Sequence, residues 1–295
     1  MVEKAKETIL ITGARGVLGR ALVKRLKLKY KIAALTHKGC EITDTRRVAA
    51  LFARIRPSIV IHTAAFTDVD GCQRDSKIAY AINTQGTYNI AKHAKSAGAL
   101  LIYISTDYVF NGKKKSPYRE EDDAYPLSIY GETKLKGEKF VKQLVKRHII
   151  IRTSWIFGQG KTGFVDKVLA RAKGNKGLKI VSDKYASPTY AVDLAKAIAR
   201  IIDAVDSSVW VDNLYGTYHI SNSGFCSWYE YAKFILESAG LKAIEIEPIP
   251  IAEMNFLAKR PLFSVLDNSK YARVFKSRLR PWQEAVKEYI ECRYN

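Results

Sequence analysis

Tyr130 and Lys134 stand four residues apart in the segment SIYGETKLKGEKF, and this spacing places both side chains on one face of a predicted helix. A lysine ammonium beside a phenol favours the phenolate, so Tyr130 should release its proton more readily than free tyrosine, whose pKa is about 10. Thr106 ends the predicted strand of LLIYISTDYVFNG, where its hydroxyl would point at the same substrate oxygen. These three residues predict general-acid catalysis on a carbonyl group held for hydride attack.

The same Tyr-x-x-x-Lys spacing occurs twice more, at Tyr88/Lys92 and Tyr229/Lys233. The first pair lies inside a long predicted helix, and the second lies far from any strand that ends in hydroxyl residues. We expect packing and solvated charge at both. Only Tyr130/Lys134 follows a strand ending in Ser-Thr, so this pair is the predicted catalytic one.

A glycine-rich turn precedes these residues in the segment ILITGARGVLGRALVKRL, with Gly13, Gly16 and Gly19 between a predicted strand at 8–12 and a predicted helix at 17–29. Glycines allow a tight turn and a close approach of the backbone to a pyrophosphate, and the first N–H groups of the helix point at its oxygens. A glycine trio also occurs in ordinary turns. The strand before it and the helix after it favour dinucleotide binding.

Predicted strands and helices alternate through the first half of the chain, which indicates an α/β fold with a doubly wound parallel sheet of the Rossmann type. Ligands of such sheets bind at the carboxyl ends of the strands. We predict an NAD(P)-binding domain at 1–158, to which later segments return, and a smaller, mainly substrate-binding lobe at 159–295. The further expected strands are 31–35, 58–62, 100–104 and 149–155, and the expected helices are 45–55, 76–97, 128–147, 190–204, 227–239 and 281–291.

The composition predicts a folded cytoplasmic protein, because 47% of its 295 residues are hydrophobic and no apolar run is long enough to span a bilayer. Four scattered cysteines form no C-x-x-C pair, so we expect no disulfide framework and no metal site. The net charge of +20 would attract nucleic acid, anionic membranes or phosphorylated small molecules. No nucleic-acid recognition motif accompanies it, and we expect mostly solvated faces, with no nucleic-acid or membrane partner.

The chain resembles the extended short-chain dehydrogenases/reductases through GARGVLG, STDYVFNG and the Tyr130-x-x-x-Lys134 pair. Within them it is similar to the dTDP-4-dehydrorhamnose reductase family over almost its whole length, through HTAAFTDVDGCQRD, PYREEDDAYPLSIYGETKLKGE, RTSWIFG, SDKYASPTYAVDLA and AKRPLFSVLD. The resemblance implies NAD(P)H-dependent reduction of the C4 keto group of dTDP-4-dehydro-6-deoxy-L-mannose to dTDP-L-rhamnose. It also implies that Thr106, Tyr130 and Lys134 form the catalytic triad.

The residues around the expected cofactor favour NADPH, with NADH as the alternative. Where family members that use NADH place an acidic residue for the ribose, this chain has Thr36, His37 and Lys38. Together with Arg15, Lys38 suits a 2′-phosphate. The resemblance adds further cofactor contacts, namely Gly13, Gly16, Val17, Leu18, Gly19, Ala64, Ala65, Phe66, Tyr130 and Lys134.

The resemblance assigns the nucleotide-sugar substrate to a second group of residues. These are Thr67, Val69, Thr106, Asp107, Trp155 and Arg260, of which Trp155 is equally well explained as a core residue. Lys113–Lys115 are expected to be exposed and outside the site.

Tyr108 distinguishes the predicted reaction from that of related 4,6-dehydratases, which carry Asp-Glu after the threonine. Without the second carboxylate the base for elimination is missing, so keto reduction is favoured. The alternatives are another nucleotide-sugar reductase or epimerase, and a non-catalytic regulatory subunit like that of methionine adenosyltransferase. A homodimer is also expected.

Overall fold

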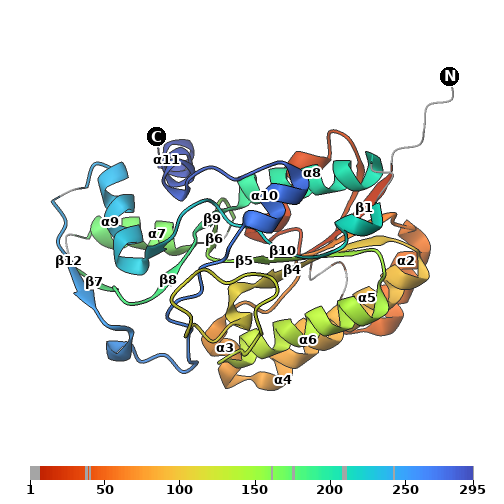
Figure 1. Ribbon diagram of the computed structural model, residues 1–295, viewed down its shortest axis with the longest axis horizontal. Helices are drawn as coiled ribbons and strands as arrows, with labels where there is room; N and C mark the ends of the chain where they lie inside the picture. Colours follow the sequence, from red (N-terminus) through yellow and green to blue (C-terminus); the bar gives the residue numbers. More distant parts are fainter. Residues whose placement is uncertain are drawn as a thin grey trace.

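A six-stranded, entirely parallel sheet forms the centre of the larger part of the molecule (Figure 1). The computed structural model describes residues 7–36, 39, 41–160, 162–174, 177–207, 211–241 and 243–294. The strand order is β10-β5-β4-β3-β1-β2. The strands are β1 (Thr8–Thr12), β2 (Lys31–Ala34), β3 (Ile59–His62), β4 (Leu100–Thr106), β5 (His148–Thr153) and β10 (Gly216–His219).

The order of strands reverses between β1 and β3, because the chain first adds β2 on one side of β1 and then β3 on the other. In doubly wound sheets this reversal opens a crevice at the carboxyl ends of the two strands, where ligands bind. The predicted fold class is therefore confirmed, and its crevice lies where the glycine-rich turn leaves β1.

Helices cover both faces of the sheet, since consecutive strand residues point to opposite sides. Ile9 and Ile11 of β1 pack with helices α1 and α8, whereas Leu10 packs with α2, α5 and α6. Figure 1 shows these two layers above and below the sheet. Their bounds are α1 (Val17–Leu26), α8 (Ala191–Ser207), α2 (Thr45–Ile55), α5 (Thr87–Ser96) and α6 (Ile129–Leu144).

The helix predicted at 76–97 is present but contains a wider π-helical turn. It consists of α4 (Ser76–Ala79), the π-helix η1 (Tyr80–Gly86) and α5. Such turns inside α-helices occur frequently at functional sites. Here the π turn carries Asn83, whose side chain bonds to the main chain of Phe66.

The second half of the chain builds a smaller core from helices and two-stranded sheets, rich in stacked and edge-on aromatic rings. Its helices are α7 (Phe164–Ala172), α9 (Trp228–Ser238) and α11 (Trp282–Tyr294), and its strand pairs are β6 (Ile156–Phe157) with β9 (Thr189–Tyr190), β7 (Leu178–Val181) with β12 (Ile246–Ile249), and β8 (Tyr185–Ala186) with β11 (Cys226–Ser227).

Two elements from the second half of the chain pack against the central sheet and the helices of the first half. Strand β10 extends the central sheet beside β5, and helix α8 packs on α1. The remaining short elements are α3 (Val69–Arg74), α10 (Ser269–Phe275), and the 3-10 turns η2 (Asp107–Val109), η3 (Val211–Leu214) and η4 (Ile251–Glu253). None of the described helices has the length and hydropathy of a membrane span.

Candidate active site

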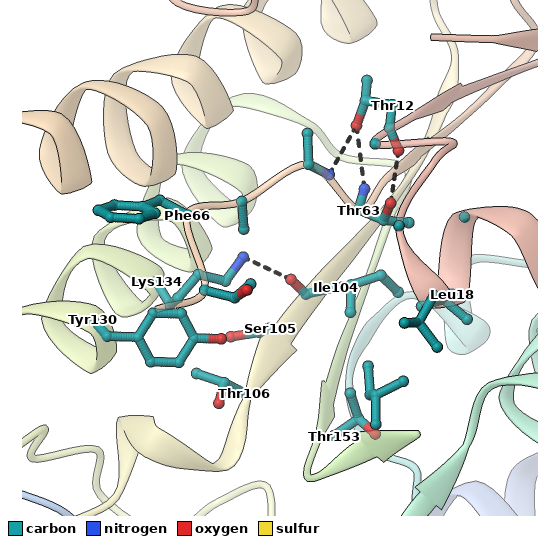
Figure 2. A pocket seen from close by; sticks show the side chains of 18 of the residues that line it. Thr12, Leu18, Thr63, Phe66, Ile104, Ser105, Thr106, Tyr130, Lys134 and Thr153 are labelled. Carbon is teal, nitrogen blue, oxygen red and sulfur yellow. Dashed lines mark hydrogen bonds between the residues drawn. The ribbon is translucent and has the colours of Figure 1, made fainter. Parts of the chain in front are cut away.

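A cavity of about 790 Å³ opens at the carboxyl ends of β1, β3, β4 and β5. Every predicted site residue whose placement is described lines it, except Arg260; His37 and Lys38 lie outside the described residues. Figure 2 shows part of its wall, with the glycine-turn side and the Tyr130 side facing one space. The predicted residues lining it are Gly13, Arg15, Gly16, Val17, Leu18, Gly19, Thr36, Ala64, Ala65, Phe66, Thr67, Val69, Thr106, Asp107, Tyr130, Lys134 and Trp155.

The glycine-rich turn has the shape that a dinucleotide requires. Gly13 has a φ of +66°, and a Cβ there would come within 2.8 Å of the Ala64 main-chain nitrogen. A Cβ at Gly19 would overlap the Gly13 carbonyl oxygen and lie 2.7 Å from the Ala14 Cα. Gly16, the N-cap of α1, offers no side chain to the first N–H groups of that helix. These groups stay available to a pyrophosphate, so the turn fits the predicted cofactor.

Thr12 links the glycine turn to the loop after β3. Its side-chain oxygen accepts hydrogen bonds from the main-chain nitrogens of Thr63 and Ala64, each 3.2 Å away, and it lies 2.7 Å from Nδ1 of the buried His62. The Thr63 hydroxyl donates to the Thr12 carbonyl at 2.7 Å, as drawn in Figure 2. Two adjacent strand ends are thereby held together along the cavity.

Lys134 lies buried on α6 with its ammonium pointing at the end of β4. Nζ donates to the Ile104 carbonyl oxygen at 2.8 Å and lies 4.1 Å from the centroid of the Tyr103 ring. Burial lowers the pKa of Lys134 to about 7, and the carboxylate of Glu138 opposes this shift. Helix α6 is thus attached to the strand that carries Thr106.

Tyr130 lies one turn before Lys134, and its hydroxyl points into the cavity (Figure 2). Burial raises the pKa of this phenol, and a hydrogen bond with the Thr106 side chain opposes the rise. The expectation that Lys134 lowers the pKa of Tyr130 was therefore wrong for this state, because desolvation dominates and the ammonium is directed at Ile104.

Local sequence places Tyr130 beside Thr106. Ser128 caps α6 by accepting from the Gly131 main-chain nitrogen at 3.3 Å. Gly131 lies so close to η2 that a Cβ there would overlap the Tyr108 carbonyl oxygen. A larger residue at this position would push the first turn of α6 away from the end of β4.

Thr106 is oriented by its neighbours as well as by the strand. Its hydroxyl donates to Oδ1 of the buried Asp107 at 3.1 Å, and its oxygen accepts from the Tyr108 main-chain nitrogen at 3.2 Å. From the sequence, we expect this hydroxyl to point directly at a substrate oxygen. In the structure this hydroxyl lines the cavity and donates to the Asp107 carboxylate.

Trp155 satisfies both sequence-based interpretations, since it lines the cavity and packs on Trp228 and Tyr231. It has a φ of +41°, a left-handed conformation that is strained for a bulky side chain. Its indole nitrogen is buried and has no hydrogen-bond partner among the described residues. Strain together with an unused donor is typical of a ligand-contacting position.

Arg260 lies apart from the main cavity, contrary to its predicted place in the cleft. Its guanidinium forms two hydrogen bonds with the Asp70 carboxylate, at 2.8 and 3.1 Å, and lies 3.5 Å from the centroid of the Phe256 ring. It lines a second, more open cavity with Lys113–Lys115. The Arg260 guanidinium also lowers the pKa of the Asp70 carboxyl. This pair connects α3 to the 258–263 segment of the second lobe.

Two buried residues that sequence reasoning missed support the site. Asn83 accepts from the Phe66 main-chain nitrogen at 2.8 Å and donates to the Phe66 oxygen at 3.0 Å. Glu138 accepts from Ser105 at 2.5 Å and forms a buried ion pair with Arg152 at 2.7 Å. Glu138 follows Lys134 by one helical turn, so its inward position could have been inferred from the same periodicity. No local signal identifies Asn83.

Comparison with known proteins places the chain among nucleotide-sugar enzymes. The family model described as the RmlD substrate binding domain matches residues 7–294. The spore coat polysaccharide biosynthesis protein SpsK of Bacillus subtilis is 41% identical, over 97% of this chain and 97% of its own. The dTDP-4-dehydrorhamnose reductase of Aggregatibacter actinomycetemcomitans is 35% identical, over 95% of this chain and 97% of its own. A solved dTDP-4-dehydrorhamnose reductase from Bacillus anthracis, in complex with NADP, superposes with a TM-score of 0.91 at 37% identity, covering 97% of this chain and 99% of that one.

Proposed function

The chain belongs to the RmlD family of dTDP-4-dehydrorhamnose reductases, and from this premise we propose that it reduces the C4 keto group of dTDP-4-dehydro-6-deoxy-L-mannose to dTDP-L-rhamnose with NADPH. The observation that carries the proposal is that Tyr130, Thr106 and the glycine-rich turn line one cavity. A keto reductase needs a proton donor and a dinucleotide site that open to the same space.

NADPH, when bound, supplies the hydride for the carbonyl carbon. Tyr130 donates its hydroxyl proton to the carbonyl oxygen, since its phenol hydroxyl projects into the cavity. A raised pKa keeps this phenol protonated before the reaction. Thr106 lines the same cavity as Tyr130, and Lys134 fixes the helix turn from which Tyr130 projects.

The cofactor contacts in this proposal come from the glycine turn and the loop after β3. The first N–H groups of α1 and those of the glycine turn would donate hydrogen bonds to the pyrophosphate oxygens. Arg15, Thr36, His37 and Lys38 are proposed to surround the adenosine ribose, where a basic residue would bind a 2′-phosphate. Val17, Leu18, Ala64, Ala65, Phe66, Tyr130 and Lys134 complete the proposed cofactor set.

The substrate is proposed to lie between Tyr130 and the second lobe, which we assign mainly to residues 159–295. Thr67, Val69, Asp107 and Trp155 would contact it. Arg260 would meet the diphosphate only after leaving Asp70, because the structure pairs the two side chains.

The test of the proposal is a coupled synthesis. The purified protein is supplied with NADPH, dTDP-glucose, a dTDP-glucose 4,6-dehydratase and a 3,5-epimerase, and the mixture is searched for dTDP-L-rhamnose by mass and retention time. We expect stoichiometric NADPH oxidation and product. Bound NADPH without turnover on this or related keto sugars would instead support a regulatory subunit, and exchange at C4 without net reduction would support an epimerase.

We propose a cytoplasmic location for this reaction. The homodimer remains a prediction, which light scattering coupled to size-exclusion chromatography can test.

A further inference from the structure

The second cavity, lined in part by Arg260 and Lys113–Lys115, has a volume of about 590 Å³, and the mechanism above does not use it. This volume lies within the range of small-molecule binding sites. The loop after η2 contributes one part of the lining, and β8 together with the 260–263 segment contributes another. Both lobes of the molecule therefore build this cavity.

Two contacts of the buried Lys184 connect the second cavity to the wall of the first. Nζ of Lys184 lies 5.1 Å from the ring centroid of Tyr108, which lines the main cavity. The same Nζ donates to the Pro261 carbonyl oxygen at 2.8 Å. Arg260 and Leu262, the two chain neighbours of Pro261, line the second cavity. The two cavities are therefore neighbours on the Tyr108 side of the candidate active site.

A nucleotide sugar carries a diphosphate, whose negative charge needs cations in addition to those that serve the cofactor. Among the described residues lining the main cavity, the cations are Arg15, Lys134 and Lys167. Arg15 belongs to the glycine turn, and Lys134 donates to the Ile104 carbonyl oxygen. Lys167 lies on α7, which follows the 158–160 segment that packs on α1. These positions favour the cofactor, so a second diphosphate needs other cations.

The second cavity supplies such cations. Lys113 and Lys115 line it, are exposed, and form no ion pair with a residue that the structure describes. Lys114, between them, pairs with Asp122. Lysine ammonium groups bind phosphate as point charges. Lys113 and Lys115 are therefore available to compensate the charge of a diphosphate.

Other parts of the lining are apolar and suit the flat face of a base. Leu127 and Leu262 line the cavity although they are 39% and 44% exposed. The ring of Tyr185 lies 6.2 Å from that of Phe263, centroid to centroid. The main chain fixes Tyr185, whose nitrogen donates to the Leu262 oxygen at 2.6 Å and whose oxygen accepts from the Ser264 nitrogen at 2.9 Å. Bases stack on aromatic side chains held in this way.

Two polar groups of the lining can bond to the edge of the base. Oδ1 of Asn111 accepts from the Lys113 main-chain nitrogen and the Tyr118 hydroxyl, each at 3.0 Å, and the amide nitrogen has no partner among the described residues. Oδ1 of Asp183 accepts from the Ile251 main-chain nitrogen at 2.8 Å, which leaves its other oxygen as an acceptor. Thymine presents carbonyl oxygens and a ring N–H, which match an amide donor and a carboxylate acceptor.

We propose that the second cavity binds the nucleoside diphosphate end of the substrate, with the base against Tyr185 and Leu262 and the diphosphate at Lys113 and Lys115. A carboxylate repels phosphate, so Asp183 belongs to the base end. This inference rests on the proposed reduction of a dTDP-linked sugar, whose keto group lies at Tyr130. It adds to that function a substrate subsite built by both lobes.

The experiment titrates dTDP into the NADPH-saturated protein by calorimetry, so that the cofactor site is already filled. The wild type should bind dTDP, and K113Q/K115Q should bind it about tenfold more weakly, because charge-assisted hydrogen bonds to the phosphates are lost. K92Q/K95Q is the matched control, since it removes two exposed lysines of α5 that line neither cavity. Equal affinities of the two double variants for dTDP, or no binding to the wild type, would overturn the proposal.

A second pair of variants tests the apolar wall. L262E places a carboxylate beside the proposed base and should abolish dTDP binding, whereas L28E, at a residue 76% exposed and outside both cavities, should retain it. Retained binding in L262E would contradict the proposed base position. Inorganic pyrophosphate serves as a probe of the lysines alone and should bind more weakly than dTDP. Equal affinity for the two would indicate an anion site without a base and overturn the inference.

These titrations need no turnover, so a wild type that reduces no keto sugar would refute the proposed function alone. Where the protein is active, K113Q/K115Q should lower kcat/KM about tenfold, and the loss should arise in KM, because the phosphates lie away from the reacting carbonyl. A loss confined to kcat would overturn the assignment of these lysines to substrate binding.

Discussion

The ammonium of Lys134 lies 2.8 Å from the main-chain oxygen of Ile104. This bond joins the helix that carries Tyr130 to the strand that ends in Thr106, two elements separated by more than twenty residues of chain. Both residues joined by the bond are buried. Lys134 therefore sets the position of Tyr130 in addition to any electrostatic effect on the reaction.

Replacing Tyr130 by phenylalanine should remove the proton donor and leave the cavity intact. We expect kcat to fall by about 10²–10⁴-fold, the usual contribution of a general acid, with NADPH affinity nearly unchanged. Steady-state kinetics and fluorescence titration of NADPH measure the two quantities. Tyr125→Phe serves as the control, since this tyrosine is 62% exposed and lies in the preceding loop. Normal turnover of the Tyr130 variant would contradict the proposed chemistry.

Replacing Lys134 by methionine should change the pH dependence of stability. The folded-state pKa of about 7 lies below the ordinary 10.5, so between these values the unfolded chain binds the extra proton. The free energy of unfolding of the wild type should consequently increase as the pH rises from about 7 to about 10.5. Lys134→Met should not show this increase.

Urea unfolding across this range measures the difference in the free energy of unfolding. Lys136→Met, on the exposed face of the same helix, provides the control, because the Glu132 carboxylate paired with Lys136 raises the pKa of that lysine instead of lowering it. Parallel pH curves for the wild type and Lys134→Met would show that the buried lysine does not titrate as we infer.

Breaking the buried ion pair of Glu138 and Arg152 should be costly, since both side chains are at most 4% exposed. Glu138→Leu leaves the Arg152 charge unpaired, and we expect a loss of about 3–5 kcal/mol in the free energy of unfolding. The double variant with Arg152→Met should recover much of it, because no uncompensated charge remains. A double-mutant cycle by urea unfolding is decisive, and additive losses would argue against the coupling.

Gly19→Ala should weaken both folding and NADPH binding. Alanine normally stabilises a helix relative to glycine, but here its Cβ would overlap the Gly13 carbonyl oxygen and move α1 off the turn. We expect a destabilisation of about 1–3 kcal/mol, as in overpacked cores. Gly177→Ala is the matched control, since a Cβ there meets nothing within 4 Å. Equal stability and NADPH affinity in the two variants would refute the close approach of helix and turn.

Cofactor choice can be tested at Arg15 of the glycine turn and at Lys38. Arg15→Ala and Lys38→Ala should each weaken NADPH binding by about tenfold or more and affect NADH little, because hydrogen bonds to charged groups contribute about 1.5–3 kcal/mol. Dissociation constants for both cofactors are measured by titration. An equal loss for NADH and NADPH would remove the argument for a 2′-phosphate site.

The sequence alone indicated most strands and helices of the first half of the chain and the local spacings of the candidate catalytic residues. Thr45–Ile55 forms the helix expected at 45–55, and the strand at 8–12 leads into the glycine turn, because hydrophobic periodicity and glycine are local signals. The relation of Tyr130 to Lys134 is equally local, since one helical turn separates them.

Only the tertiary structure decided which charges meet and which are buried. Lys134 binds Ile104, Arg260 pairs with Asp70, and Asn83 bonds to Phe66, although nothing in their spacing indicates these contacts. The pKa of Tyr130 moves opposite to the expectation because desolvation depends on everything packed around the phenol. Periodicity specifies which way a side chain faces within its own element, whereas its partners depend on how distant elements pack.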